Sequence, residues 1–394
     1  MDSRSKSIPQ VELNGPCPTR PVEETEPLPG DRWLASSVLQ KAIRRGDVLI
    51  AQRAVRTLYR HDPRSAWHRL VIIAFEDVGI GALGAVGMAT SLNSNADARR
   101  ELGGDETAAL ATSEMLAKSP KDRSADLLFA AVLHDPALEI VRTECRCLSI
   151  ARRLEWVADP TLSLPERALA AWHSSGVASW GDRPVGPGDL GALMRTYAEL
   201  GVPERLLEAV VHATKKTREP FVLMLPLLWL VTADGETELV DSPLAPSGLI
   251  KGVPLYALDR HTRLGGEAIG RFGRENGEIA QFLTEHASSS REGALRMAVF
   301  YADSALTRPT LQWRQSAELT AAGTAADFHK VNVAAGVGAA LVQLVRAHVA
   351  HLNAIRAQVL SRALTPHAER VGPMSSVGDV PTHSRGADDA SELG

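Results

Sequence analysis

The sequence predicts an all-α protein, a multi-helix array with at most a minor β-hairpin. Helix start and stop signals recur along most of the chain, and the segments between them are too long for ordinary strands. Evidence for strands is confined to one short region. With 394 residues, of which 44% are hydrophobic and 23% charged, the chain is long enough for two or three domains.

The clearest helix is expected between His61 and Gly79. Asp62 has the side chain of an N-cap, Pro63 suits the first helical position, and Gly79 can end the helix. A second His-Asp-Pro signal, at 134–136, opens another helical stretch over 137–159. Further helices are expected at 33–46, 48–60, 105–119, 124–134, 164–176, 187–201 and 203–217, with a final long one from about Ala325 to Leu364.

The one strand signal lies around Asp234 and Gly235, where the segments 228–233 and 237–241 are candidates for a hairpin. No internal repeat is evident, and the Gly/Pro-rich stretches 176–189 and 241–254 are the expected joints. The chain is therefore divided into four parts. They are a disordered leader (1–30), a helical domain (31–175), a second helical domain (190–365) and a disordered tail (366–394), the end segments being rich in polar residues and proline.

The composition is typical of a cytoplasmic protein. The net charge of −4 is no global basic signature, so nucleic acid would need a local patch. Cys145 and Cys147 lack a second pair that would complete a metal site, and we expect neither metal nor cofactor. The longest apolar stretch, 221–231, contains a proline and is too short for a bilayer, which needs about 20 residues, so we expect no membrane contact. The seven tryptophans are scattered and are expected in the core.

The segment Arg-Leu-Val-Ile-Ile-Ala-Phe-Glu-Asp-Val-Gly-Ile-Gly, 69–81, has two interpretations. Residues 79–84 match the G-x-G-x-x-G pattern of a dinucleotide-binding loop. However, Glu76 and Asp77 would repel a pyrophosphate, and no strand ending in an acid follows about 20 residues later. We therefore favour a buried helix that ends on two acids.

Two acids at a helix C-terminus oppose the helix dipole, so nearby cations should offset them. From Asp31 to Leu70, nine arginines and lysines face three aspartates, a local net charge of +6. We expect Glu76 and Asp77 to form internal ion pairs with arginines such as Arg44 or Arg69. A catalytic or metal-binding role for the two acids is the alternative.

At these residues the chain resembles a known family. Leu39–Gly79 is similar to the C-terminal helical portion of the replication-associated recombination protein A family, AAA+ ATPases related to clamp loaders. The segment 118–126, Lys-Ser-Pro-Lys-Asp-Arg-Ser-Ala-Asp, resembles a lysine-serine-proline stretch that follows in that family. The matching positions in the first segment are Lys41, Arg44, Asp47, Asp62, Pro63, Arg69, Leu70, Glu76, Asp77, Val78 and Gly79.

The resemblance covers roughly residues 35–135 and departs from the family in three places. Phe75 stands where serine is usual, and Asp122 and Arg123 stand where an Asn-Ala pair is usual. No G-x-x-x-x-G-K-[ST] phosphate loop occurs, so the ATPase module is absent. The resemblance implies an oligomerising, clamp-loader-collar-like helical domain without its motor.

A second site-like stretch is 255–276. Asp259 or Thr262 suits a helix N-cap, and Asp259 with His261 is a possible acid–base pair or ligand set, with Arg263 beside it. Glycines at 265, 266, 270 and 273 weaken a helix and suggest close approach by another backbone or by a ligand. The alternative is a tightly packed helix with a solvated basic face.

The sequence favours a non-catalytic helical accessory protein of DNA replication, recombination or repair, which acts through protein or DNA contacts. A homo-oligomer or a replication or repair protein is the expected partner. The candidate DNA- or partner-binding residues are Lys41, Arg44, Arg45, Arg260, Arg263 and Arg271. The alternative is an enzyme whose site is the Asp259–His261–Arg263 cluster or the dinucleotide loop at 79–84. A third interpretation is a scaffold whose helical surfaces only assemble.

Overall fold

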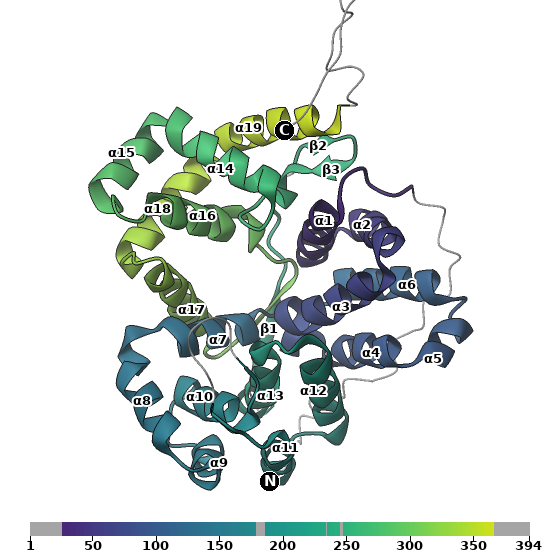
Figure 1. Cartoon of the computed structure of the whole chain (residues 1–394), viewed down its shortest axis with the longest axis vertical. Coiled ribbons are helices and arrows are strands. Elements are labelled where there is room, and N and C mark those ends of the chain that lie inside the picture. Colours follow the sequence, from purple (N-terminus) through teal and green to yellow (C-terminus); the bar gives the residue numbers. More distant parts are fainter. Residues whose placement is uncertain (1–25, 179–185, 234, 245–246, 366–394) are drawn as a thin grey trace, which may run out of the picture.

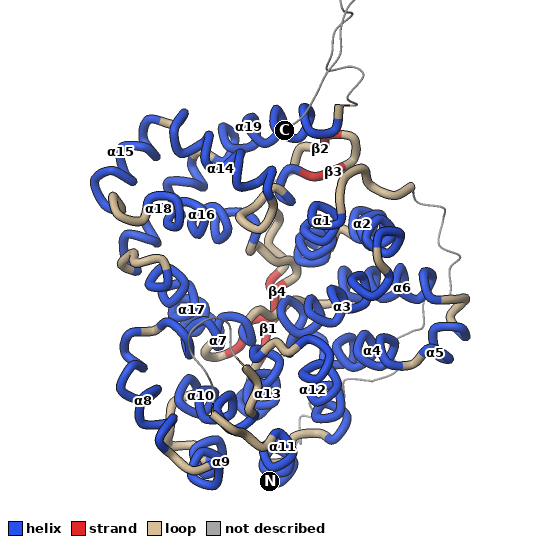
Figure 2. Tube along the Cα trace, in the orientation of Figure 1, coloured by secondary structure: helices blue, strands red, loops and turns tan. Residues whose placement is uncertain are grey.

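The computed structural model describes residues 26–178, 186–233, 235–244 and 247–365, and it confirms the all-α class (Figures 1 and 2). The expected leader and tail lie almost wholly outside the described residues. Two small antiparallel sheets of two strands each accompany the helices. Strand β1 (Thr237–Val240) pairs with β4 (Thr310–Trp313), and β2 (Leu249–Ile250) pairs with β3 (Val253–Pro254). The expected hairpin at 228–241 is wrong, because Leu225–Thr232 forms helix α13.

The N-terminal helices follow from their caps. Helices α1 (Arg32–Arg45), α2 (Val48–His61) and α3 (Pro63–Ile73) each begin after an aspartate whose side chain accepts a backbone N–H of the first turn. Helix α3 continues into a π-helix, Ala74–Val78, and then a 3-10 turn, Gly79–Ala82. Helices α4 (Leu83–Ser94), α5 (Ala96–Glu101) and α6 (Asp105–Lys118) complete this region.

The middle of the chain is a group of shorter helices. The expected helix over 137–159 is two helices, because Ser149 caps a new start after Leu148. The elements are α7 (Ser124–His134), a 3-10 turn (Pro136–Leu138), α8 (Glu139–Cys147), α9 (Ile150–Ala158), α10 (Leu164–Ser175), α11 (Leu190–Glu199), α12 (Glu204–Thr217), a 3-10 turn (Pro220–Met224) and α13.

The C-terminal helices begin after a 3-10 turn, Leu255–Ala257. Helix α16 (Arg291–Val299) continues, like α3, into a π-helix, here Phe300–Ser304. The expected long helix starts earlier and is three helices, because the backbone turns at Val331–Ala334 and again at His348. The remaining helices are α14 (Arg263–Glu275), α15 (Gly277–His286), α17 (Ser316–Lys330), α18 (Ala335–Ala347) and α19 (Val349–Leu364).

A local arrangement recurs in the two ends of the chain, although the sequence shows no evident repeat. Both α1–α2–α3 and α14–α15–α16 are three successive helices followed by a π-helix with aspartate at its fourth position, Asp77 and Asp303. The second helix of each unit starts at an Asx N-cap, Asp47 or Asn276, and each unit carries the tripeptide Ile-Ala-Gln at the same distance from that cap.

The helices share one hydrophobic core. Buried apolar side chains form a continuous cluster from Leu28 to Leu360, and both sides of the expected joint at 176–189 contribute to it. Helices α7 and α17 pack against each other (Figure 1), and Gly323 permits their close approach, since a Cβ there would lie 2.6 Å from the carbonyl oxygen of Leu127. Strands β1 and β4 lie near the centre of the molecule (Figure 2).

One helical run has the length and apolarity of a membrane span. It extends from Pro63 to Ser94, with a mean hydropathy of 1.8 in its most apolar window, and 61% of that window is buried within the protein. Helices α17 and α18 pass the same test only when taken together, and they are bent by 99°. A mostly buried run of this kind is also what the core helix of a globular protein provides.

Candidate functional site

A buried ion-pair cluster is centred on Arg44 of α1. Its Nε lies 2.5 Å from Oδ1 of Asp77, and one terminal nitrogen lies 2.8 Å from Oε1 of Glu76. The other terminal nitrogen donates to the carbonyl of Ser304, 3.0 Å away. Gln40, one turn earlier, donates to the second oxygen of Asp77. The predicted internal pairing of the two acids with Arg44 is thus confirmed.

A second arginine, Arg123, enters the cluster from the segment before α7. Its Nε lies 3.2 Å from Asp77, and its guanidinium also pairs with Asp126. The ring of Phe300, in the second π-helix, packs against the guanidinium groups of Arg44 and Arg123, with centroid distances of 5.5 and 5.3 Å. The cluster therefore joins three separate parts of the chain.

The two acids differ in their surroundings. Asp77 is fully buried, whereas 17% of the Glu76 side chain is exposed. Burial raises the pKa of Glu76 to about 7, and the charges of Asp77 and Asp126 act in the same direction against the two arginines. Burial likewise raises the pKa of Asp126. Arg44 makes its closest contact with Asp77 and Arg123 makes its closest contact with Asp126, so Glu76 is a proton-binding group at the edge of the cluster.

The glycines that follow the acids serve packing. Gly79 has φ of 49° and ψ of −134°, and a Cβ there would lie 2.7 Å from the carbonyl oxygen of Asp122. A Cβ at Gly81 would lie equally close to the carbonyl of Pro120. The amide of Asp122 donates to the Asp77 carbonyl at 3.0 Å. Residues 79–84 therefore accommodate the 118–126 segment and follow a helix rather than a strand, so the dinucleotide-binding alternative is wrong.

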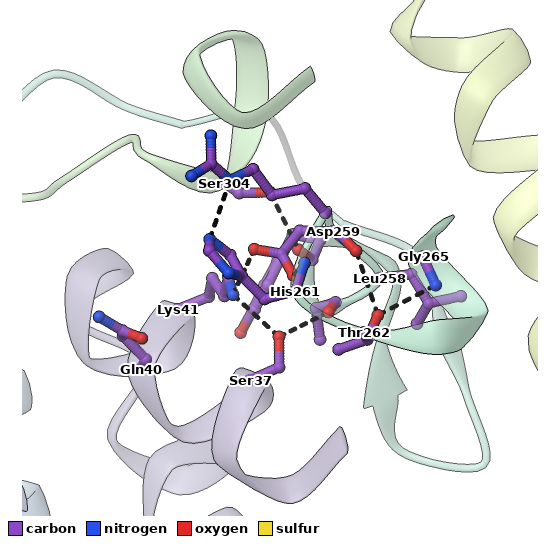
Figure 3. Close-up of polar contacts among 12 residues, drawn as sticks. Ser37, Gln40, Lys41, Leu258, Asp259, His261, Thr262, Gly265 and Ser304 are labelled. Atoms are coloured by element: carbon purple, nitrogen blue, oxygen red, sulfur yellow. Dashed lines mark hydrogen bonds and ion pairs between the residues drawn. The ribbon is translucent and has the colours of Figure 1, made fainter. Parts of the chain in front are cut away.

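A second buried pair links α1 to the segment before α14 (Figure 3). The ammonium of Lys41 lies 2.6 Å from Oδ2 of Asp259 and donates to Ser37, whose hydroxyl donates to the carbonyl of Ala257. Burial lowers the pKa of Lys41. Burial alone would raise the pKa of Asp259, but the Lys41 charge and the backbone N–H of His261 hold it below its usual value.

The Asp259–His261 pair is not arranged for acid–base chemistry. The carboxylate of Asp259 accepts the backbone N–H of His261 at 3.0 Å, whereas the imidazole Nε2 accepts from Arg260. Desolvation lowers the pKa of His261, so the ring is a neutral acceptor at neutral pH. Thr262 is the N-cap of α14, and a Cβ at Gly265 would lie 2.0 Å from the Asp259 carbonyl oxygen, so this glycine serves close backbone packing.

A third cluster is built on Asp303, the counterpart of Asp77 in the second π-helix. Its two carboxylate oxygens lie 2.5 Å from Arg45 and 2.6 Å from Arg356 of α19. Arg356 is fully buried and also donates to the carbonyl of Leu258. Each π-helix thus presents its fourth-position aspartate to two arginines, one of which comes from α1 in both cases.

Most of the basic residues that the sequence suggested for binding DNA or a partner are not free on the surface. Lys41, Arg44 and Arg45 point into the ion-pair clusters, so their charges do not face solvent. Arg260 stacks on Phe300 with 5.2 Å to the ring centroid, and Arg271 pairs with Glu275. Of the six candidate residues, only Arg263, the first residue of α14, is exposed and forms no side-chain hydrogen bond or ion pair with the described residues.

Arg69 lies outside the Arg44 cluster and lines a groove on the outer side of α1 and α3. The same groove is lined by Trp33, whose side chain is 60% exposed, so the expectation that the tryptophans are core residues is wrong at this position. Sequence reasoning missed this site. Its only sequence signal is the Arg-Trp pair at the start of α1, within the basic segment 31–70.

Cys145 is buried and Cys147 exposed, so the two thiols do not face a common site.

No protein-family model matches the chain, and comparison with curated proteins and with solved structures finds no similar protein.

Proposed function

We propose that the chain is a non-catalytic helical accessory protein of DNA replication, recombination or repair. It works in the cytoplasm through protein–protein or DNA contacts, either as a homo-oligomer or with a replication or repair protein. We infer the cellular process from the resemblance of residues 35–135 to the replication-associated recombination protein A family. We infer the non-catalytic character from the lack of a phosphate-binding loop motif in the sequence.

One observation carries the proposal. The two stretches that bear the resemblance, Leu39–Gly79 and 118–126, lie side by side. Of the matched positions, Arg44 binds Glu76 and Asp77, and Gly79 leaves room for the backbone carbonyl of residue 122. Arg123, which departs from the family pattern, also binds Asp77. The matched residues of the first stretch therefore meet in one cluster, against which the second stretch packs.

The test follows a fluorescent fusion of the full-length chain in its native cell. We expect the fusion to concentrate at replication sites or at forks arrested by DNA damage, and to disperse when initiation of replication is blocked. A distribution that is uniform under all three conditions would contradict the proposal. Turnover of ATP by the purified chain would overturn the non-catalytic part.

A further inference from the structure

A groove of about 700 Å³ lies where several helix ends meet on the outer side of the N-terminal helices. The start of α1, the junction of α2 and α3, and the ends of α4 and α12 form its walls, with α5 and the start of α6. We call it the basic groove and define it by Arg32, Trp33, Arg64, Arg69, Arg99 and Lys216. Its volume is in the range of sites that hold ligands of one or a few ring systems.

The lining of the basic groove has a strong charge imbalance. Five arginines and lysines face a single acid, Asp105. That carboxylate is already engaged, because it pairs with Arg99 and accepts from Tyr59 at 2.8 Å and from Trp67 at 3.3 Å. Asp105 therefore holds Arg99, Tyr59 and Trp67 in place and does not pair with the other four cations of the lining.

Four of the cations, Arg32, Arg64, Arg69 and Lys216, have no ion pair with the described residues. Arg32, Arg64 and Lys216 are exposed and Arg69 is half-buried. Asp62, the cap of α3, is an acid near Arg64, and its pKa is lowered by a hydrogen bond with Ser65 and, to a lesser extent, by the charge of Arg64. The positive charges also act on neighbouring histidines. The pKa of His68 is lowered by desolvation and, to a lesser extent, by the charge of Arg69. The pKa of His212 is lowered by desolvation and, to a lesser extent, by the charges of Lys216 and Lys215. Uncompensated cations in a concave wall concentrate positive potential and attract anions.

The helix termini at the groove add little to this potential. Helices α1, α3 and α6 all begin there, at Arg32, Pro63 and Asp105. Asp31 and Asp62 cap the first two helices, and Asp105 stands in the first turn of the third, so carboxylates already offset the partial positive charge of each helix end. The attraction for phosphate therefore comes from the side-chain cations.

Trp33 gives the groove a stacking surface. The side chain is 60% exposed, which is unusual for so large an apolar group, and the Arg32 guanidinium carbon lies 4.7 Å from the ring centroid. The arginine lies over one face of the indole, and more than half of the side chain remains open to solvent. An exposed indole beside cations can stack with an unpaired nucleobase.

We propose that the basic groove binds single-stranded DNA, with a base stacked on Trp33 and the flanking phosphates on Arg64, Arg69 and Lys216. The choice of DNA as the ligand rests on the proposed function. The new elements are the binding site and the single-stranded form of the DNA. A duplex hides its bases from Trp33, so it would use only the cations. An acidic peptide would likewise use the cations without a planar group to match the indole.

The test measures binding of a fluorescein-labelled oligothymidylate to the full-length chain by anisotropy at several salt concentrations. We expect Trp33→Ala to weaken binding by at least about five-fold, the loss of one base stack. Trp33→Phe should retain part of that affinity. Lys216→Gln should weaken binding and reduce the slope of log affinity against log salt by about 0.7, the value for one phosphate contact on a single strand.

Two matched controls separate the groove from general effects. Lys330→Gln removes an exposed lysine from α17, and Ile140→Ala removes an 81% exposed apolar side chain from α8. Both should bind as the wild type does, and thermal unfolding should show that every variant is folded. Loss of affinity in Lys330→Gln equal to that in Lys216→Gln would overturn the assignment.

Three further outcomes would also overturn it. The first is that the wild type does not bind the oligonucleotide at low salt. The second is that poly-glutamate displaces the oligonucleotide as effectively as unlabelled oligothymidylate does. The third is that thymidine monophosphate competes as strongly as the oligomer. Failure of the groove remains distinct from failure of the proposed function. A fusion that gathers at replication sites although no variant affects DNA binding would leave the function with protein contacts alone.

Discussion

The ammonium of Lys41 lies 2.6 Å from a carboxylate oxygen of Asp259, and the two side chains are only 3% and 0% exposed. The pair joins the first helix to the segment that precedes α14. Removing one member of a buried ion pair leaves the other charge without compensation in a poorly solvated place, which costs more than the pair itself contributes.

Lys41→Met should therefore lower the free energy of unfolding by about 3–5 kcal/mol. The double variant Lys41→Met/Asp259→Leu should recover much of that loss, because no unpaired charge remains. Urea unfolding at pH 7 measures both. Lys118→Met is the control, since Lys118 is 64% exposed and pairs with Glu114 on the surface, where pairs contribute little. Equal losses in Lys41→Met and Lys118→Met would contradict the prediction.

Asp77→Asn should destabilise the fold by a similar amount, roughly 3–5 kcal/mol, because this fully buried carboxylate is the closest partner of Arg44 and also pairs with Arg123. Asp97→Asn tests the specificity of the effect. Asp97 and its partner Arg100 are 73% and 75% exposed, so the unfolding midpoint of that variant should equal that of the wild type. An unchanged unfolding midpoint in Asp77→Asn would show that the arginines are satisfied without Asp77.

Glu76→Gln should change the pH dependence of stability more than stability itself. The folded-state pKa of about 7 exceeds the ordinary glutamate value of 4.5, so the folded protein binds this proton more tightly than the unfolded chain does. The resulting stabilisation is complete below pH 4.5 and is lost as the pH rises through about 7.

Because glutamine cannot ionise, Glu76→Gln should gain stability relative to the wild type between pH 5 and pH 8. Urea unfolding of both proteins at intervals of one pH unit gives the comparison. If their unfolding free energies run parallel over that range, the proton is not bound at Glu76.

Gly79→Ala should destabilise by on the order of 2 kcal/mol or more. The residue has a φ of 49°, and the added methyl group would lie 2.7 Å from the Asp122 carbonyl oxygen. Gly87→Ala is the matched control in the next helix, α4, where an added Cβ meets nothing within 4 Å. That substitution should stabilise by roughly 0.5–1 kcal/mol, because alanine favours a helix. Thermal unfolding of the two variants should move in opposite directions.

Much of the secondary structure could be predicted because its signals are local. The Asp62-Pro63 start and the Asp47 cap each act on residues within one turn, so they can be read in the sequence. The breaks at Ser149 and Val331 were missed because apolar residues continue across them. The pairing of β1 with β4 was missed because neither strand carries information about a partner so far along the chain.

The candidate site could be predicted only in part for the same reason. Charge balance indicated that Glu76 and Asp77 need an arginine, but Arg44 and Arg69 satisfy that rule equally well in the sequence. The choice depends on which face of α1 packs against the π-helix. The Lys41–Asp259 pair and the exposure of Trp33 are likewise results of helix packing, and no local pattern encodes them.

The contact between Arg44 and the carbonyl of Ser304 spans 260 residues. At about 5–20 residues per second, a ribosome needs on the order of tens of seconds to make the chain between them. During that time α1 has emerged, but Asp259 and Asp303, the partners of Lys41 and Arg45, have not yet been made. Glu76 and Asp77, the partners of Arg44, follow it by only 32 and 33 residues. In the nascent chain Lys41 and Arg45 therefore stay without their partners until most of translation is complete, although the helix that carries them is synthesised early.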